Sequence, residues 1–420
     1  MTILEKEIFR LNEYDSKSFI TKKRAVEILD TAPEFKKELL KVFGYNDKVL
    51  EVLKIGNAKQ LIDAIESIDS QCVKIDIISK IKDVRLHKLL ESEKALFEIF
   101  SIDNNFVLKN NKSDVLEAET RYDAKTDILD YYNFSKFANY CRDLEYEDLV
   151  GVIKKYLQSK NVDNNEQRKL RLLYKNDDKK FFIRALTSIQ DYKNFGVNFS
   201  VFVALMALGK YVESSKNEVF IDNFSVDDSS VYVSFSFLGD TVIDNNMSLS
   251  FSLILENDEI KRSAVSFNGM FKLNITREKR TSEIYIKPRG LRKTDNSYPV
   301  DLLNYQHRGT VNNVFEKLQD LPKLIDHFIN QVSSDAKRIS TITHPDDVRK
   351  FIGDKVKFSK KPEFKQYKDK IFRKLMSVSV DNTFKLFDLL REVEELFEHD
   401  DIVSLNFWRT KLYEALVERN

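Results

Sequence analysis

The sequence predicts an α+β protein with a helical N-terminal bundle, a central antiparallel sheet with a flanking helix, and a helical C-terminal region. Through most of residues 22–160 and again after Thr310, apolar residues recur three and four positions apart, as in helices. Between residues 219 and 286, apolar residues alternate with Ser, Asn or other small residues, which is typical of strands with one buried face. Gly (10) and Pro (6) are sparse in the 420 residues, which favours long helices over irregular loops.

The first domain, residues 1–160, is expected to be a helical bundle. The segment PEFKKELLKVFG begins with Pro33 and ends at Gly44, the residue types that favour the start and the end of a helix. Three further segments with helical spacing follow: NDKVLEVLKIG, NAKQLIDAIESI and CVKIDIISKI. After a polar break at 101–112, helices are expected to resume up to residue 160. The polar, Asn-rich segment NVDNNEQ at 161–167 then marks a domain boundary.

The second domain, residues 168–310, is expected to hold the mixed α+β core. Phe181–Ser188 is a candidate strand, and Asn194–Tyr211 is apolar enough to be a buried helix. The strands then follow as VFIDNFSV, VYVSFSF, MSLSFSLILE, RSAVSFNGMFKLN and SEIYIKPRG, the last of them ended by Pro288. Residues 311–420 complete the chain as a helical C-terminal region, in which Pro322 is expected to interrupt or restart a helix.

The overall composition excludes a strong global attraction to polyanions. Lys and Arg number 68 against 67 Asp and Glu, so any electrostatic interaction surface must be local. The two cysteines, Cys72 and Cys141, are far apart and are expected to be buried thiols in a reducing compartment. No signal peptide is expected, and the longest strongly apolar run, Val201–Gly209, is shorter than the ~20 residues of a bilayer-spanning helix. These features predict a cytoplasmic protein that does not bind membranes.

Several fragments between residues 168 and 420 resemble a known family in their order and spacing. They are LRLLYKNDDKKFFIRALTSIQDYKNFGVN, KRSAVSFNGMFKL with its Asn-Gly step, YQHRGTVNNVFEKL, and NFWRTKLYEALVERN. The chain resembles the phage- and plasmid-borne "domain of unknown function 932" family, which has a Cys where Phe267 precedes the Asn-Gly step here. The resemblance implies an α+β domain from a phage or other mobile genetic element, and it implies no defined reaction.

The strand-loop Arg277–Lys293 is the first candidate binding surface. It holds seven Lys or Arg against two Glu, with an aromatic ring among them. A line of cations suits a phosphate backbone, and an aromatic face suits the bases of a single strand. The candidate nucleic-acid-binding residues are Arg277, Lys279, Arg280, Tyr285, Lys287, Arg289, Arg292 and Lys293, with His307 and Arg308 on the next segment. The alternative is a solvated edge strand whose charges deter aggregation.

A second basic segment lies at Arg349–Lys374, which contains eleven basic residues and three acidic ones. It includes Lys360, Lys361 and Lys365 as candidates of second rank. The next segment, Asp381–Asp401, has eight acidic residues against two basic. The favoured interpretation is a pair of helices whose charges neutralise each other, within the chain or between subunits.

The sequence offers little for catalysis. Glu259-Ile-Lys261 beside Asp258, and Glu363-Phe-Lys365, spell the Glu-x-Lys of a metal nuclease, but short triplets arise by chance in so charged a chain. The five histidines are far apart in the sequence, so no metal site or cofactor is expected. The leading hypothesis is therefore a non-enzymatic protein that binds nucleic acid, preferably single strands. The alternative is an assembly component of a phage, antiviral defence or counter-defence complex that binds a second copy of itself or another protein of the same system, and a metal nuclease ranks third.

Overall fold

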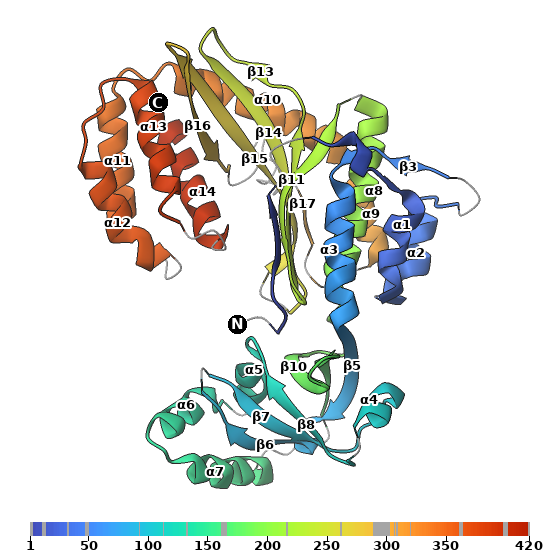
Figure 1. The fold of residues 1–420 in the computed structure, drawn as a ribbon. Coiled ribbons are helices and arrows are strands. Elements are labelled where there is room, and N and C mark those ends of the chain that lie inside the picture. The colour runs from blue at the N-terminus through green and yellow to red at the C-terminus, as the bar shows by residue number, and fades with distance from the viewer. Residues whose placement is uncertain are drawn as a thin grey trace.

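The computed structural model describes residues 3–10, 14–31, 33–46, 50–91, 93–111, 113–131, 133–160, 166–215, 217–260, 263–288, 303–305, 307, 310–319, 321–360, 364–397 and 402–418. A curled antiparallel sheet carries helices at both ends, and the α+β class is confirmed (Figure 1). A second, smaller sheet lies beside it, joined through the long helix α3 (Ala58–Gln71) and the strand β5 that continues from it.

The larger sheet has nine strands, and its main path runs β1-β11-β12-β14-β15-β16 with antiparallel pairing throughout. Three strands lie off this path: β4 pairs with β11, β13 with β14 and β17 with β15. The bounds are β1 Glu7–Arg10, β4 Ile55–Gly56, β11 Val219–Val226, β12 Ser230–Phe237, β13 Thr241–Val242, β14 Met247–Asp258, β15 Ser263–Arg277, β16 Arg280–Ile286 and β17 Leu303–Tyr305. The sequence predicted β11, β12 and β14–β16 because their alternation marks one buried face.

The smaller sheet has six strands in the order β5-β9-β10-β8-β7-β6. Its bounds are β5 Cys72–Lys80, β6 Val84–Leu89, β7 Ala95–Ile99, β8 Leu116–Thr120, β9 Gln167–Lys175 and β10 Lys180–Thr187. Helices α5 (Ala124–Asp130), α6 (Ser135–Asp143) and α7 (Glu147–Lys160) cover one face and share a core with it. A further two-stranded sheet joins β2 (Ile20–Thr21) to β3 (Val52–Leu53).

The main core lies under the inner face of the nine-stranded sheet. Helix α8 (Val197–Ser215) is buried on nearly every side, as its apolar sequence predicted, and it packs with α10 against β14. The remaining helices are α1 Lys22–Glu27, α2 Lys36–Val42, α4 Asn105–Asn110, α9 Val311–Gln319, α10 Leu321–Ser340, α11 Pro345–Lys357, α12 Lys365–Met376, α13 Thr383–Glu394 and α14 Ile402–Glu418. The helical C-terminal region is thus confirmed.

The prediction of an all-helical first domain is wrong for residues 72–120, which form β5–β8 apart from the short helix α4. The segment CVKIDIISKI has apolar residues at both helical and alternating spacing, so its period does not decide its structure. It becomes a strand because β9, some ninety residues later, pairs with it in full register from Cys72 to Lys80. The boundary drawn at 161–167 therefore falls inside one sheet.

Gly269 on β15 makes close packing between the sheet and α10 possible. It lies opposite Leu253 on the inner face, where a Cβ atom would come within 2.1 Å of the Phe328 ring. That ring is 1% exposed and packs against Phe251 at 5.4 Å between centroids. The Asn-Gly step of the sequence is therefore a packing requirement at this point.

Both cysteines are buried free thiols that form no disulfide bond, as expected from their spacing. Burial raises the pKa of Cys72 to about 11. Among the helices of the described residues, none combines the length and the apolar character needed to cross a bilayer.

Candidate functional site

The tip of the β15–β16 hairpin presents three of the predicted nucleic-acid-binding residues to solvent. Arg277 and Arg280 face each other at the strand ends, and Lys279 lies in the turn between them. The turn residues Glu278 and Lys279 have φ of 50° and 68°, a backbone region that usually takes Gly or Asn in such hairpins. The Arg277 side chain is 54% exposed, and its one ion pair within the described part of the chain is with its neighbour Glu278 at 3.7 Å. These cations are therefore well placed to meet a polyanion.

Tyr285 and Lys287, at the other end of β16, are held by internal contacts. The Lys287 side chain is 12% exposed, and its ammonium lies 3.2 Å from a carboxylate oxygen of Glu256. The Arg409 guanidinium lies over the Tyr285 ring, 4.6 Å from its centroid. One face of the Tyr285 ring is thus covered. Tyr285 and Lys287 therefore do not belong to the exposed surface at the hairpin tip.

His307 is buried between the two sheets. Its ring stacks on Tyr192 with centroids 5.1 Å apart, and its Nε2 lies 3.0 Å from the carbonyl oxygen of Asp258. The other predicted residues, Arg289, Arg292, Lys293 and Arg308, lie outside the described residues, as does Lys361. The ten predicted residues therefore do not form one surface in the part of the chain that the structure describes.

A broader basic surface lies on the hairpin of helices α11 and α12. Phe358, in the loop after α11, is 72% exposed on it. Among the described residues of 345–360 and 364–377 three Asp are exposed, Asp347, Asp354 and Asp369, against seven exposed cations: Lys350, Lys355, Lys357, Lys360, Lys365, Lys370 and Arg373. We call these seven cations and Phe358 the α11–α12 basic face.

The acidic helix α13 does little to neutralise this face. Arg391 of α13 pairs with Asp388 and Glu395 on the same helix, and Glu394 pairs with Arg409 of α14. Among described residues, one ion pair joins α12 to α13, between Lys374 and Glu392 at 2.6 Å. The expected neutralisation of the basic segment by the acidic segment thus amounts to one ion pair among the described residues. The α11–α12 basic face therefore keeps its positive charge.

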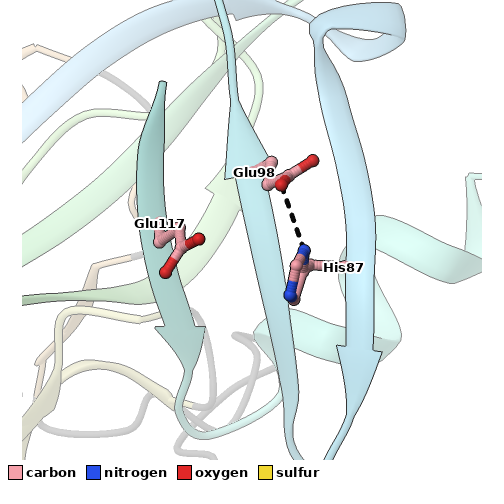
Figure 2. Close-up of side chains that lie close together, drawn as sticks. All are labelled: His87, Glu98 and Glu117. Atoms are coloured by element: carbon pink, nitrogen blue, oxygen red, sulfur yellow. Dashed lines mark hydrogen bonds and ion pairs between the residues drawn. The ribbon is translucent and has the colours of Figure 1, made fainter. Parts of the chain in front are cut away.

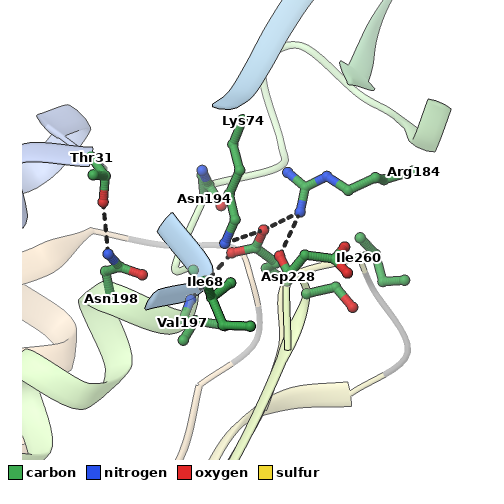
Figure 3. Close-up of polar contacts among 12 residues, drawn as sticks. Thr31, Ile68, Lys74, Arg184, Asn194, Val197, Asn198, Asp228 and Ile260 are labelled. Carbon is green, nitrogen blue, oxygen red and sulfur yellow. Dashed lines mark hydrogen bonds and ion pairs between the residues drawn. The ribbon is translucent and has the colours of Figure 1, made fainter. Parts of the chain in front are cut away.

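A buried ionic cluster joins the two sheets (Figure 3). The carboxylate of Glu259, after β14, contacts the Arg184 guanidinium of β10 and the Lys74 ammonium of β5, the latter at 3.1 Å. Burial alone would raise the pKa of Glu259, but the charges of Lys74, Arg184 and Arg171 outweigh it and hold the pKa far below its usual range. Glu259 is therefore a carboxylate at every physiological pH.

Arg171 of β9 and Asp228 of the β11–β12 turn extend the cluster. Arg171 donates to the backbone carbonyl of Glu259 and, at 3.0 Å, to the Tyr192 hydroxyl. Arg184 also donates to the carbonyl of Asp228 at 3.0 Å, and Tyr122 donates to the Asp228 carboxylate at 2.8 Å. Both arginines are 1% exposed or less. Two nitrogens of Arg184, Nε and Nη2, are buried without a hydrogen-bond partner among the described residues. The cluster connects the two sheets, and removal of one charged partner from such a buried group is costly.

Two local features make the cluster possible. Arg184 is the extra residue of a β-bulge, since Ile183 and Ala185 pair with consecutive residues of β9. Gly196, just before α8, leaves room for Glu259, because a Cβ atom there would lie 2.5 Å from its Oε2. The cluster therefore depends on backbone irregularities as well as on charged side chains.

The geometry does not favour the nuclease hypothesis. Glu259 faces three cations, which would oppose a divalent metal at the same carboxylate. Its triplet partner Lys261 lies outside the described residues, as does Glu363 of the second triplet, while Lys365 is exposed.

A separate set of metal-compatible donors lies on the exposed face of the smaller sheet (Figure 2). His87, Glu98 and Glu117 come from β6, β7 and β8, and their donor atoms all lie within 4.8 Å of one another. Nδ1 of His87 lies 3.0 Å from Glu98, and Glu98 is directly opposite Glu117. One imidazole and two carboxylates suit a divalent cation such as Zn²⁺ or Mn²⁺. Sequence reasoning missed this set because helices were expected in this part of the chain, whereas the three residues meet across neighbouring strands.

Comparison with known protein families, with curated proteins and with solved structures finds no match for this chain. The resemblance noted from the sequence fragments therefore stays a prediction.

Proposed function

We propose that this chain binds nucleic acid through the α11–α12 basic face, with single strands preferred. One observation carries the proposal: the described residues of the α11–α12 hairpin expose seven cations and an aromatic ring, against three exposed aspartates. Among described residues, no carboxylate lies in ion-pair contact with Lys357, Lys360, Lys365, Lys370 or Arg373, so these cations are available to phosphates. The exposed Phe358 offers a face on which a base can stack.

The hairpin tip is a second contact surface in this proposal. Its three cations, Arg277, Lys279 and Arg280, are exposed. Their substitution by alanine is expected to weaken binding without loss of stability, because none of the three supports the core.

The test is binding of a fluorescent single-stranded 20-nucleotide oligomer, followed by anisotropy from 50 to 200 mM salt. Replacing Lys357, Lys360, Lys365 and Lys370 by alanine is expected to weaken binding at least tenfold. It should also make the negative slope of log K against log salt concentration shallower by about 3, since each lost phosphate contact removes about 0.7–1 from its magnitude.

The matched control removes four exposed lysines elsewhere, with Lys37, Lys41, Lys54 and Lys59 replaced by alanine. The two variants change the net charge equally, so only a local site can distinguish them. Equal loss of affinity in both, or no binding by the unmodified protein at 50 mM salt, would overturn the proposal.

Self-association is a second candidate function, favoured by an exposed apolar surface on α6 and α7. Along α7, Leu149, Val152 and Tyr156 form one stripe and are 42%, 64% and 60% exposed. Tyr146 of the connecting loop lines the same surface as Leu149 and is 56% exposed, and Tyr140 of α6 is 58% exposed. Contiguous apolar surface of this kind marks interaction sites in folded proteins.

A second copy of the chain is the occupant that fits this surface. Asp148 is exposed near the start of α7 and Lys155 toward its end. In an antiparallel α7–α7 pair around a two-fold axis, each aspartate would meet the partner's lysine while the apolar stripes face each other.

Light scattering tests this second function. The unmodified protein is expected to give twice the 49.3 kDa chain mass, and Val152→Asp with Leu149→Asp is expected to restore the single-chain mass. Val242→Asp is the control, because Val242 is 75% exposed on β13 and far from α7 in the sequence. A single-chain mass for the unmodified protein at high concentration would contradict the prediction.

A further inference from the structure

The outer face of the nine-stranded sheet is hollowed into a groove because its central strands carry small side chains there. The inner residues of β12 and β14 are Phe, Leu and Val, whereas Ser236, Ser250 and Ser252 point outward. The hydroxyls of Ser236 and Ser252 lie 2.9 Å apart across the two strands. Helices α13 and α14 pack at the β16 edge and form the far wall of the groove.

The groove has a volume of about 860 Å³ and both aromatic and charged walls. This volume lies in the range of small-molecule sites, which is roughly 300–1,000 Å³. Tyr232 forms its floor with Met270, and Tyr285 forms a side. Its charged lining residues are five acidic, Asp222, Asp240, Glu283, Glu394 and Glu395, and three basic, Lys272, Arg391 and Arg409. The balance of charge favours a cationic ligand.

Most of these charges are already satisfied by protein groups. Lys272 pairs with Glu283, Arg391 with Glu395 and Arg409 with Glu394. Asp240 accepts hydrogen bonds from the Ser248 hydroxyl at 2.9 Å and from Ser250 and Asn274. Each of these carboxylates therefore has a donor within the protein.

Asp222 differs from the rest. Its Oδ1 is buried and has no hydrogen-bond partner among the described residues. Burial raises the pKa of Asp222, and the nearby hydroxyls of Ser234 and Ser236 offset only part of that effect. Because an unsatisfied buried carboxylate oxygen is unfavourable, a donor brought by a ligand would gain a strong hydrogen bond there.

A β-bulge aims Asp222 into the groove. Ile221 and Asn223 pair with consecutive residues of β12, which leaves Asp222 as the extra residue of β11. Bulges redirect side chains in this way and often lie next to binding sites. The side chains of Tyr232 and Tyr285 are close enough for the charge of Asp222 to act on both phenols.

We propose that the groove binds a compact organic cation, a protonated amine on an apolar or aromatic body. The ammonium would bind Asp222, and the body would lie against Tyr232 and Tyr285. Carboxylate and aromatic groups together recognise ammonium ions through charge and through the negative face of the ring. This site is independent of the nucleic-acid function, because the α11–α12 basic face contributes no residue to it.

The experiment is calorimetric titration with benzylamine, phenethylamine and tryptamine, each compared with its neutral alcohol. At least one amine is expected to bind at least tenfold more tightly than its alcohol. Nα-acetyl-lysine amide, which keeps the side-chain ammonium, is titrated as a further probe. Tighter binding of this compound than of the three amines would assign the site to a lysine side chain of a peptide. Equal binding of amines and alcohols, or binding of none of the probes, would overturn the proposal.

Two variants locate the site. Asp222→Asn keeps the shape of the side chain and is expected to weaken amine binding at least tenfold while leaving alcohol binding unchanged. Tyr285→Leu keeps the carboxylate and is expected to weaken both classes of probe. Glu278→Gln is the control, since Glu278 is 84% exposed on the hairpin tip. Thermal unfolding verifies that each variant is folded, and unchanged amine affinity in Asp222→Asn would refute the assignment.

Discussion

Glu259→Gln is expected to lower the free energy of unfolding by about 3–5 kcal/mol, because removing one partner leaves buried charges uncompensated. In this variant Arg184, which is almost fully buried, and Lys74 would lose the carboxylate that lies between them. Arg171 would keep its ion pair with Asp76 at 3.3 Å, so the loss falls mainly on Arg184 and Lys74. Urea unfolding at pH 7 measures the effect. A loss below about 1 kcal/mol would show that the cluster contributes little to the docking of the two sheets.

The dependence of stability on pH gives a second measure of the same cluster. The pKa of Glu259 is lowered in the folded protein, so its stabilisation is complete above the unfolded pKa and is lost as pH falls toward the folded value. Below about pH 5 the unmodified protein should therefore lose stability more steeply than Glu259→Gln. The control is Glu278→Gln, which removes an exposed carboxylate and should follow the unmodified protein.

Gly269→Ala is expected to destabilise the protein by about 1–3 kcal/mol through overpacking. The new methyl group would come within 2.1 Å of the Phe328 ring, which is buried between α10 and the sheet and has little room to move. Thermal or urea unfolding measures the change.

A smaller residue at 328 should relieve the clash. Phe328→Leu alone loses packing, but combined with Gly269→Ala it should cost less than the sum of the two single changes. Gly151→Ala is the matched control, because nothing lies within 4 Å of a Cβ atom there and Gly151 is exposed on α7. Additive effects of the two substitutions would contradict direct contact between them.

The sequence predicted those elements whose pattern is set locally. In strands β11, β12 and β14–β16 apolar and polar residues alternate clearly, and in the C-terminal helices apolar residues recur at consistent helical spacing. In the smaller sheet the candidate strand Phe181–Ser188 is confirmed as β10. The other strands of this sheet were missed because they are short or ambiguous in period, and because β5 is fixed by pairing with β9 across a long stretch of chain. Local patterns contain little information about such distant pairing.

The polar sites were harder to predict because several of them lie at β-bulges. Arg184, Asp222 and His87 are each the extra residue where the register shifts, so each breaks the alternation that would reveal its direction. One usable signal was present: Arg171 and Arg184 interrupt the apolar runs LRLLY and FFIRALT. An arginine inside a buried strand requires an anion, and that reasoning could have led to Glu259.

The pairing of β1 with β11 has a consequence for how the chain is made. Glu7 lies beside Val226, so the first strand must wait for more than two hundred further residues before its partner leaves the ribosome. At roughly 5–20 residues per second this delay is on the order of 10–40 s. All strands of the smaller sheet, residues 72–187, emerge before β11 does. The smaller sheet can therefore form first during synthesis, while the N-terminal strand remains an unpaired edge that a nascent-chain chaperone could shield.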